Sequence, residues 1–278
     1  MPLVIIDFHT HIFPPDVRER RQEYLRRDPT FAEMYASPRA KIAGAEDLLR
    51  SMDEAGVDVS VALGFAWRDH EDCVRHNDYL LESAARSGGR IAPFCTVNLQ
   101  AGAAAAAEVE RCALAGARGL GELRPESQGW SPDGEPGSLL AGLARRHNLV
   151  LLFHVTELGD RDYPGKQGLR LDLFYRFVVA HPEIVTVGAH LAGGLPLNDA
   201  PRPEAYADTA ALRYLYEQQV LAEAGTGSWA ERLLFGSDFP LVAQAAALAD
   251  VRESGLDSAA LARVLGGNAG GLLPPAGI

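Results

Sequence analysis

Four histidines and one aspartate lie at the ends of short apolar segments, a placement typical of metal ligands in an α/β fold. His9 and His11 end LVIIDFHTH, His154 ends LVLLFH, His190 ends VTVGAH and Asp238 ends RLLFGSD. Neutral imidazole is the commonest metal donor in proteins, and carboxylates bind the same ions. The five residues predict a site for one or two divalent ions. Zn²⁺ is the preferred ion, and Mn²⁺, Fe²⁺, Co²⁺ and Ni²⁺ are alternatives.

Two further carboxylates lie in the same kind of position. Side chains two apart on a strand share a face, so His9 and His11 project together, with Asp7 deeper on that face. We interpret Asp7 as a buried structural partner of the site. Glu122, in GLGELRP, is either a salt-bridge partner of Arg124 or a carboxylate that bridges two metal ions. Both interpretations stay open.

Substrate contacts are assigned to residues that follow the predicted strands. Arg124 could bind a carboxylate or phosphate group, or form an ion pair at the rim. Trp67 and Arg68 follow the second apolar segment and could form a wall of the pocket. Asp208 is expected to be structural, because an aspartate in an apolar segment must find a hydrogen-bond donor.

The predicted site supports metal-assisted chemistry. A divalent ion lowers the pKa of a bound water to about 7 and polarises a carbonyl oxygen. Asp238 would accept the proton of that water and pass it to the leaving group. His190, where it is not a ligand, would stabilise the developing negative charge. Asp238 and His190 are therefore the predicted catalytic residues.

The elements that must position these residues alternate along the chain. Short apolar segments buried on both faces indicate parallel strands, and the longer stretches between them have helical composition. The predicted strands are 3–8, 59–65, 91–97, 117–123, 149–155, 185–191, 205–211 and 232–238. The predicted helices are 44–56, 103–117, 138–148, 169–182, 211–225 and 241–255.

Eight such alternations predict a parallel sheet with helices outside it. HTHIFPP stands where an open doubly wound sheet would carry a glycine-rich turn, so we predict a closed (β/α)₈ TIM barrel with its site at the strands' carboxyl ends. We expect one domain over residues 1–278, an insertion at about 12–43 over the barrel mouth, a loop at 192–204 and a C-terminal closing helix.

Composition limits the partners. The net charge of −11 opposes binding to nucleic acid and to anionic membranes, because the summed field repels phosphates. Three cysteines without a C-x-x-C pair indicate no disulfide framework. The N-terminus lacks the pattern of a signal peptide. We therefore expect a cytoplasmic enzyme that acts on a small molecule and could form a homo-oligomer.

These motifs resemble the amidohydrolase superfamily, most closely its amidohydrolase-related branch. The resemblance rests on D-x-H-x-H after the first strand, the histidines after strands five and six, HLAGG, RLLFGSDFP and GGNAGGLL, and it covers nearly the whole chain. It implies that His9, His11 and Asp238 bind the more buried ion and that His154 is a further ligand. His190 is implied to be a ligand in two-metal members and a free imidazole in one-metal members. No lysine ends a predicted strand, so Glu122 could bridge two ions instead.

The resemblance leaves several activities open. The first is metal-dependent hydrolysis of a small amide, lactone or ester. The alternative is non-oxidative decarboxylation of an aromatic or unsaturated carboxylic acid by a one-metal site, which also needs an arginine for the substrate carboxylate. The chain is short beside typical decarboxylases of the branch, which favours hydrolysis. Phosphoester or nucleic-acid hydrolysis, as in the deoxyribonuclease-type members, is disfavoured by the acidic charge balance. A non-catalytic metal-binding protein is also disfavoured, because every ligand position is filled.

Overall fold

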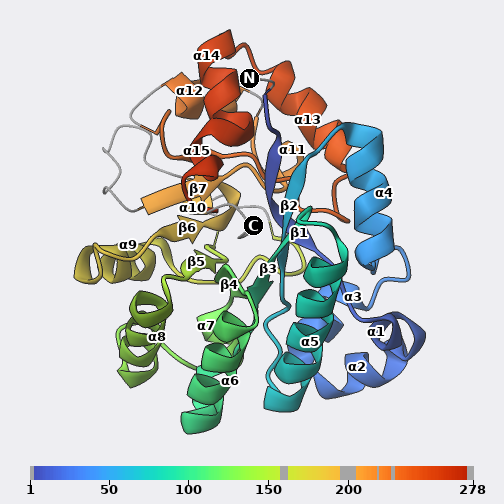
Figure 1. The fold of residues 1–278 in the computed structure, drawn as a ribbon, viewed down its shortest axis with the longest axis vertical. Coiled ribbons are helices and arrows are strands. Elements are labelled where there is room, and N and C mark those ends of the chain that lie inside the picture. Colours follow the sequence, from blue (N-terminus) through green and yellow to red (C-terminus); the bar gives the residue numbers. More distant parts are fainter. Residues whose placement is uncertain (1–2, 157–161, 195–204, 218, 227–228, 274–278) are drawn as a thin grey trace.

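Eight parallel strands form one sheet in chain order, which confirms the predicted barrel topology (Figure 1). The structure is a computed structural model that describes residues 3–156, 162–194, 205–217, 219–226 and 229–273. The strands are β1 (Ile6–His11), β2 (Val59–Leu63), β3 (Ile91–Cys95), β4 (Gly119–Leu123), β5 (Val150–Phe153), β6 (Thr186–Gly188), β7 (Ala205–Asp208) and β8 (Leu233–Leu234).

The barrel closes between β1 and the chain that follows β8. The backbone N–H of His11 donates to the carbonyl of Phe239 at 2.7 Å, and the N–H of Asp238 donates to the carbonyl of His9 at 2.9 Å. Closure therefore brings Asp238 beside His9 and His11, although more than two hundred positions separate them in the sequence.

Helices surround the barrel, as Figure 1 shows. Each of the predicted helices 44–56, 103–117, 169–182 and 241–255 contains one observed helix. The predicted helix 138–148 overlaps one observed helix, and the predicted helix 211–225 corresponds to two separate helices. The helices between the insertion and the predicted closing helix are α4 (Ala45–Ala55), α5 (His70–Arg86), α6 (Ala103–Leu114), α7 (Pro125–Gln128), α8 (Glu135–His147), α9 (Leu171–Ala180), α10 (Ala189–Gly194), α11 (Leu212–Leu215), α12 (Gln219–Thr226) and α13 (Gln244–Arg252). A short helical turn, η1 (Leu99–Ala101), precedes α6.

The helix α5 is absent from the sequence-based prediction, although it is the longest helix of the described chain. Its sequence, HEDCVRHNDYLLESAAR, is strongly polar, and its buried face includes Asp72, His76 and Asn77. The missed signal is the aspartate before it: the side chain of Asp69 accepts a hydrogen bond from the N–H of Asp72, which is a helix N-cap.

The predicted closing helix is built from three short pieces. They are α14 (Ser258–Ala262), the π-helical turn η2 (Arg263–Gly267) and α15 (Asn268–Gly270). Gly266 packs against the first strand so closely that a Cβ there would lie 2.0 Å from the carbonyl oxygen of Val4. The close approach allows the end of the chain to cover the amino end of β1.

The predicted insertion at 12–43 folds into three short helices beside the barrel mouth. They are α1 (Pro15–Glu19), α2 (Arg21–Arg27) and α3 (Pro29–Tyr35). An aromatic cluster attaches them to the barrel: Phe31 stacks on Tyr35 at 4.6 Å between ring centroids and on Trp67 at 5.3 Å. Aromatic side chains bury much apolar area with few rotamers to fix, so this contact holds the insertion in one position.

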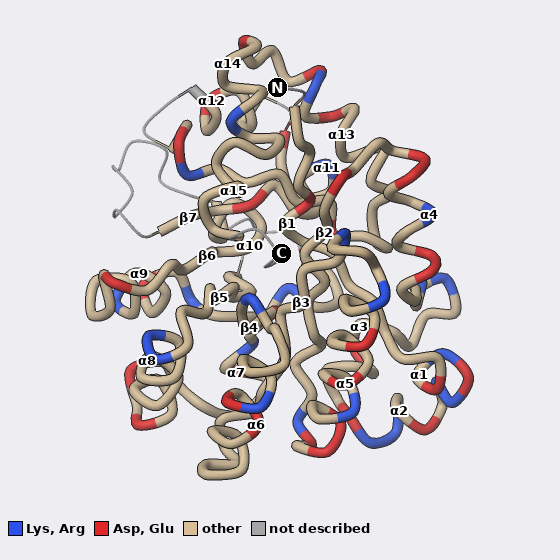
Figure 2. The backbone as a smooth tube through the Cα atoms, viewed as in Figure 1, with Lys and Arg blue, Asp and Glu red and all other residues tan. Residues whose placement is uncertain are grey.

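Charged side chains lie mainly along the outer helices, where both signs are interspersed, and the central strands carry few (Figure 2). Within the described residues, no helix is both long enough and apolar enough to cross a membrane.

Candidate metal centre

The six predicted metal ligands converge at the carboxyl ends of the strands. Five of them line a pocket of about 430 Å³; they are His11, Glu122, His154, His190 and Asp238. His9 lies beneath the pocket with no exposed surface. The tilt of the strands and the closure of the barrel produce this convergence, because each strand end contributes one or two side chains to the same axis.

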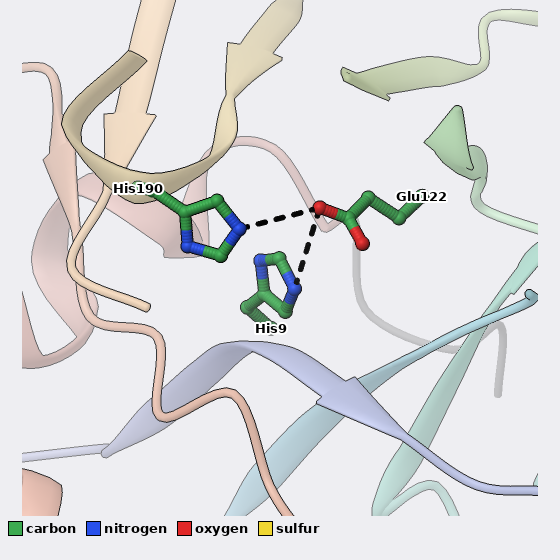
Figure 3. A group of neighbouring side chains, drawn as sticks. All are labelled: His9, Glu122 and His190. Atoms are coloured by element: carbon green, nitrogen blue, oxygen red, sulfur yellow. Dashed lines mark ion pairs between the residues drawn. The ribbon is translucent and has the colours of Figure 1, made fainter. Parts of the chain in front are cut away.

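Two groups of potential ligands share His9. In the first, His9 Nε2 lies 3.1 Å from His11 Nε2, and Asp238 Oδ1 lies 3.7 Å and 3.4 Å from those two nitrogens. In the second, Glu122 Oε1 lies 4.0 Å from His9 Nε2 and 3.5 Å from His190 Nε2 (Figure 3). All the ligand atoms of each group lie within 4.8 Å of one another, so either group could hold a metal ion.

His154 belongs to neither group but lies against the second. Its Nδ1 is 2.7 Å from Glu122 Oε1 and 3.2 Å from His190 Nε2. The pKa of His154 falls to about 4, because burial and the nearby Arg124 both oppose a charged imidazole. The ring is therefore neutral at ordinary pH, which is the form that can bind a metal ion.

The hydrogen bonds of three histidines test whether a cation fits here. Each ring has one nitrogen bonded to an acceptor outside the centre. His9 Nδ1 is 2.8 Å from Asp208 Oδ2, His154 Nε2 is 3.3 Å from the carbonyl of Lys166, and His190 Nδ1 is 3.1 Å from the carbonyl of Ala210. A neutral imidazole carries one N–H, so the other nitrogen of each ring presents a lone pair to the centre. Three lone pairs and two carboxylates then face one another, which is the donor set of a divalent cation.

The charges of the centre also favour a bound cation. Burial alone lowers the pKa of His9, but Asp208, Glu122 and Asp238 outweigh it and raise that pKa to about 10. Burial raises the pKa of Asp238, yet its hydrogen bond to His11 and the charge of His9 bring it down to about 2. Burial likewise opposes ionisation of Glu122, and the surrounding histidines hold its pKa well below the ordinary value. The carboxylates are thus ionised, and the centre favours positive charge, which a metal ion would supply in place of the second proton of His9.

A buried polar network supports the centre from below. Asp7 Oδ2 accepts hydrogen bonds from the hydroxyl of Ser237 at 2.6 Å and from the amide of Gln244 at 2.8 Å, and Asp7 Oδ1 accepts from the N–H of His9 at 3.2 Å. Burial raises the pKa of Asp7 to about 6 despite these donors. Asp7 thus contacts the backbone of His9 and the residue before Asp238, which matches its interpretation as a buried partner.

His190 lies just beyond its strand rather than on it. The strand β6 ends at Gly188, and His190, Leu191 and Ala192 have positive φ angles of 58°, 54° and 48°. Non-glycine residues rarely adopt this left-handed conformation, which costs roughly 1–2 kcal/mol per residue. The turn directs the His190 ring toward Glu122. Part of the loop predicted at 192–204, residues 195–204, lies outside the described residues.

The pocket above the centre is mostly apolar and is walled partly by the insertion. Met34, Tyr35 and Lys41 come from the insertion, and Phe65 and Ala66 follow β2. Other wall residues come from the loops after β4, β5, β7 and β8; among them are Arg124, Tyr163, Gly165, Ala211, Tyr214, Leu215, Pro240 and Leu241. The sequence does not identify Tyr35 or Lys41 as pocket residues, because only the packing of the insertion brings them to the barrel mouth.

The three residues predicted to contact substrate differ in position. Arg124 lines the pocket with its side chain almost fully buried, whereas Trp67 and Arg68 are not among the lining residues. Trp67 is buried in the aromatic cluster and donates to His76 Nδ1 at 2.9 Å. Arg68 Nε donates to the carbonyl of Ser127 at 2.7 Å. The structure therefore places Trp67 and Arg68 behind or beside the pocket wall and leaves Arg124 facing the cavity.

Sequence reasoning also missed the role of one buried carboxylate. Asp208, at the end of β7, was interpreted only as structural, yet it contacts the ring of His9 directly. Its position at a strand end, like that of the predicted ligands, is the signal that could have placed it at the centre.

The barrel and its cluster of imidazoles and carboxylates define a class: metal-binding (β/α)₈ enzymes with their site at the strands' carboxyl ends. The chain belongs to the amidohydrolase family, whose sequence profile, described as "Amidohydrolase", matches residues 6–274. This finding confirms the resemblance drawn from the motifs. No curated protein matches the chain.

Solved structures with the same fold include several decarboxylases. The 5-carboxyvanillate decarboxylase from Sphingomonas paucimobilis superposes with a TM-score of 0.78 at 18% identity, covering 97% of this chain and 98% of that one. The 2,6-dihydroxybenzoate decarboxylase from Rhizobium gives 0.73 at 18% identity, with 97% and 98% covered. A dihydroxybenzoic acid decarboxylase from Polaromonas sp. JS666, solved with bound manganese, gives 0.74 at 18% identity, with 97% and 96% covered. At these identities the similarity establishes the fold alone.

Proposed function

We propose that this protein is a metal-dependent, non-oxidative decarboxylase of a small aromatic or unsaturated carboxylic acid. The observation that carries the proposal is Arg124. Its side chain lines the pocket and is only 2% exposed, and among the described residues no carboxylate forms an ion pair with it. A buried guanidinium that faces a cavity without a counter-ion is suited to bind an acid group of a substrate.

The hydrogen bonds of Arg124 within the described residues use only part of its guanidinium. Its Nη2 donates to the carbonyls of Gly165 and Gln167 at 2.6 Å and 2.5 Å, and its Nη1 lies 3.4 Å from Met34 Sδ. Its Nε has no partner among the described residues. The apolar walls around it, including Phe65 and Ala66, suit a flat ring. This pocket agrees with the activities named for the three similar structures described above, each a decarboxylase of an aromatic acid.

Chain length does not argue against this function. On the sequence alone, a chain shorter than typical decarboxylases of the branch favours hydrolysis as the predicted activity. The superposition nevertheless covers 98% of the 5-carboxyvanillate decarboxylase. A barrel of this length therefore includes nearly all of that enzyme's fold.

The proposed reaction breaks the bond between the carboxyl group and its carbon. The electron pair stays on the carbon, which takes up one proton, and the carboxyl group leaves as carbon dioxide. His9, His11 and Asp238 would hold a divalent ion, with His154 as the further ligand that the family resemblance implies. Such an ion would supply fixed positive charge for an acid or phenolate oxygen of the substrate. We assign Zn²⁺ or Mn²⁺ to this centre, because both accept imidazole and carboxylate donors.

The protein's own residues do the rest. Arg124 binds and orients the acid group, and the apolar walls exclude water. Both His190 and Asp238 line the pocket. His190, or Asp238 once it has accepted a proton from water, delivers the proton to the carbon.

A second candidate is hydrolysis of an amide, lactone or ester by a two-metal centre, and the position of Glu122 favours it. Its Oε1 lies 3.5 Å from His190 Nε2, and its Oε2 lies 3.6 Å from His11 Nε2. Glu122 therefore reaches histidines of both ligand groups, as a bridging carboxylate must. The two candidates differ in product and in metal content.

The test is a carbon dioxide assay with protein loaded with Zn²⁺ or Mn²⁺. Dihydroxybenzoates and carboxylated methoxyphenols serve as acids, and a panel of amides, lactones and esters serves as the comparison. We expect carbon dioxide in proportion to acid consumed. Arg124→Met should raise KM about 10- to 100-fold, the cost of one hydrogen-bonded ion pair. Arg86→Met, on the exposed face of α5, is the matched control. Hydrolysis of the panel without carbon dioxide from any acid would overturn the proposal.

A further inference from the structure

We infer that Asp208 is a positioning residue of the metal centre, which fixes the tautomer of His9 and holds the backbone at His190. Asp208 has no exposed surface and lies at the end of β7. Its Oδ2 is 2.8 Å from His9 Nδ1, and its Oδ1 accepts from the N–H groups of His190 at 2.9 Å and Ala210 at 3.0 Å. One carboxylate thus contacts residues of both ligand groups.

The bond to His9 decides which ring nitrogen can bind a metal ion. A carboxylate can only accept, so the hydrogen between Asp208 and His9 belongs to Nδ1. Nε2 is then the lone-pair nitrogen, and it is the atom that lies 3.1 Å from His11 Nε2. Three histidines have a ring nitrogen hydrogen-bonded to an acceptor outside the centre. That acceptor is a carboxylate for His9 and a backbone carbonyl for His154 and His190. Such a partner fixes the ring and raises its basicity as a ligand.

The chain after β8 packs closely against both side chains. A Cβ built on Gly236 would lie 2.9 Å from His9 Cβ and 3.3 Å from Asp208 Cβ, so only glycine lets this backbone approach so closely. The hydrogen bond and the packing therefore act on the same two side chains.

The other oxygen of Asp208 supports the left-handed turn at His190. The peptide group on the amino side of His190 donates to Oδ1, and the carbonyl of His190 accepts from the hydroxyl of Tyr216 at 2.9 Å. These bonds offset part of the cost of the positive φ at His190. The same carboxylate thus orients one ligand by its ring and another by its backbone.

Asp208→Asn is the decisive variant. An amide has the same shape as a carboxylate, but its NH₂ donates a hydrogen bond where the carboxylate oxygen accepts one. The N–H groups of His190 and Ala210 select the amide oxygen. The amide NH₂ then faces His9 Nδ1 and forces the proton onto Nε2, which can no longer bind a metal ion. We expect Zn²⁺ affinity to fall about 10- to 100-fold.

The experiment uses the full-length protein and Zn²⁺ alone. Affinity is measured by competition with a chelating dye, and the His9 tautomer by ¹⁵N chemical shifts of ring-labelled histidine, assigned with His9→Gln. At a Zn²⁺ concentration that saturates wild type, wild type should show a protonated Nδ1 and a metal-bound Nε2, and Asp208→Asn a protonated Nε2. Asp208→Ser removes the acceptor of the ring but leaves an acceptor for the backbone, so its affinity should lie between the two.

Asp28→Asn is the matched control. Asp28 is another buried aspartate that accepts from two backbone N–H groups, those of Phe31 and Arg68, and it contacts no imidazole. Its Zn²⁺ affinity should equal that of wild type. Wild-type affinity and tautomer in a folded Asp208→Asn, or an equal loss in Asp28→Asn, would overturn the inference. The test measures metal binding rather than turnover, so its outcome is independent of the proposed decarboxylation.

Discussion

At the scale of single residues, the position of Glu122 is the feature that most divides the possible chemistries. The sequence alone is compatible with Glu122 as a partner of Arg124 and with Glu122 as a bridging ligand. The structure shows no ion pair between Glu122 and Arg124 among the described residues, and it shows Glu122 beside four histidines. Glu122 therefore lies within the candidate metal centre, and the metal content of the protein would show how many ions that centre holds.

The variant Glu122→Gln answers that question. Under the proposed one-metal decarboxylation, wild type and Glu122→Gln should each contain one ion per chain. The variant should lose turnover about 100-fold, because a neutral amide no longer balances the histidines around it. Elemental analysis of protein purified without chelator and loaded with Zn²⁺ gives the stoichiometry. Two ions in wild type and one in Glu122→Gln would support two-metal hydrolysis instead.

At the scale of elements, hydrogen bonds of His76 link α5 to two chain segments at the barrel mouth. Trp67 Nε1 donates to His76 Nδ1 at 2.9 Å, and His76 Nε2 donates to the carbonyl of Ile12 at 2.7 Å. One neutral imidazole therefore joins α5 to the chain after β1 and to the chain after β2. The same helix carries no predicted site residue, so its importance to the mouth is visible only in the structure.

Acid should weaken these hydrogen bonds of His76. Burial lowers the pKa of His76 from 6.5 to about 4. Below pH 6.5 the His76 imidazole binds a proton in the unfolded chain, whereas in the folded chain it stays neutral until about pH 4. Acid therefore favours unfolding. His76 alone should account for a fall of roughly 3 kcal/mol in the free energy of unfolding across that interval.

Urea unfolding across this pH range checks the prediction. His76→Gln should be less stable near neutrality but should lose less stability on acidification than wild type. His181→Gln, at the end of α9, serves as the control and should keep the wild-type slope. An unchanged slope in His76→Gln would show that other groups cause the acid sensitivity.

At the scale of the whole molecule, the candidate metal centre links distant parts of the chain. Its proposed ligands come from β1 and from the chain at β4, β5, β6 and β8, with Asp208 on β7. A bound ion therefore stabilises the closed barrel as a unit, because the ligands are brought together only in the folded state.

Metal removal should consequently lower thermal stability. Adding metal at a hundred times its Kd stabilises the folded state by about 2.7 kcal/mol. For a chain of this size the melting temperature should fall by roughly 5 to 10 °C when a chelator removes the ion. Scanning calorimetry with Zn²⁺, with Mn²⁺ and with chelator measures the change. His9→Gln should melt at the same temperature in all three, and a metal-dependent shift in that variant would place the stabilising ion elsewhere.

The sequence by itself determined the order of the strands and the identity of the residues at their ends. Buried parallel strands have a distinctive apolar pattern, and topology alone gathers their carboxyl ends, so His9, His11, His154, His190 and Asp238 could be placed together. The limits of each element were less certain: β6 stops at Gly188 rather than at 191, because His190 begins a left-handed turn that no local pattern announces.

Only the tertiary structure decided how the side chains meet across the barrel. Asp208 and His9 are 199 positions apart, and their bond depends on the tilt and register of strands that do not pair with each other. Trp67 and Arg68 follow a strand as Arg124 does, yet only Arg124 faces the pocket, because the insertion's aromatic cluster encloses Trp67. Local pattern fixes which residues stand at a strand end, whereas side-chain direction and partners depend on packing between segments far apart in the chain.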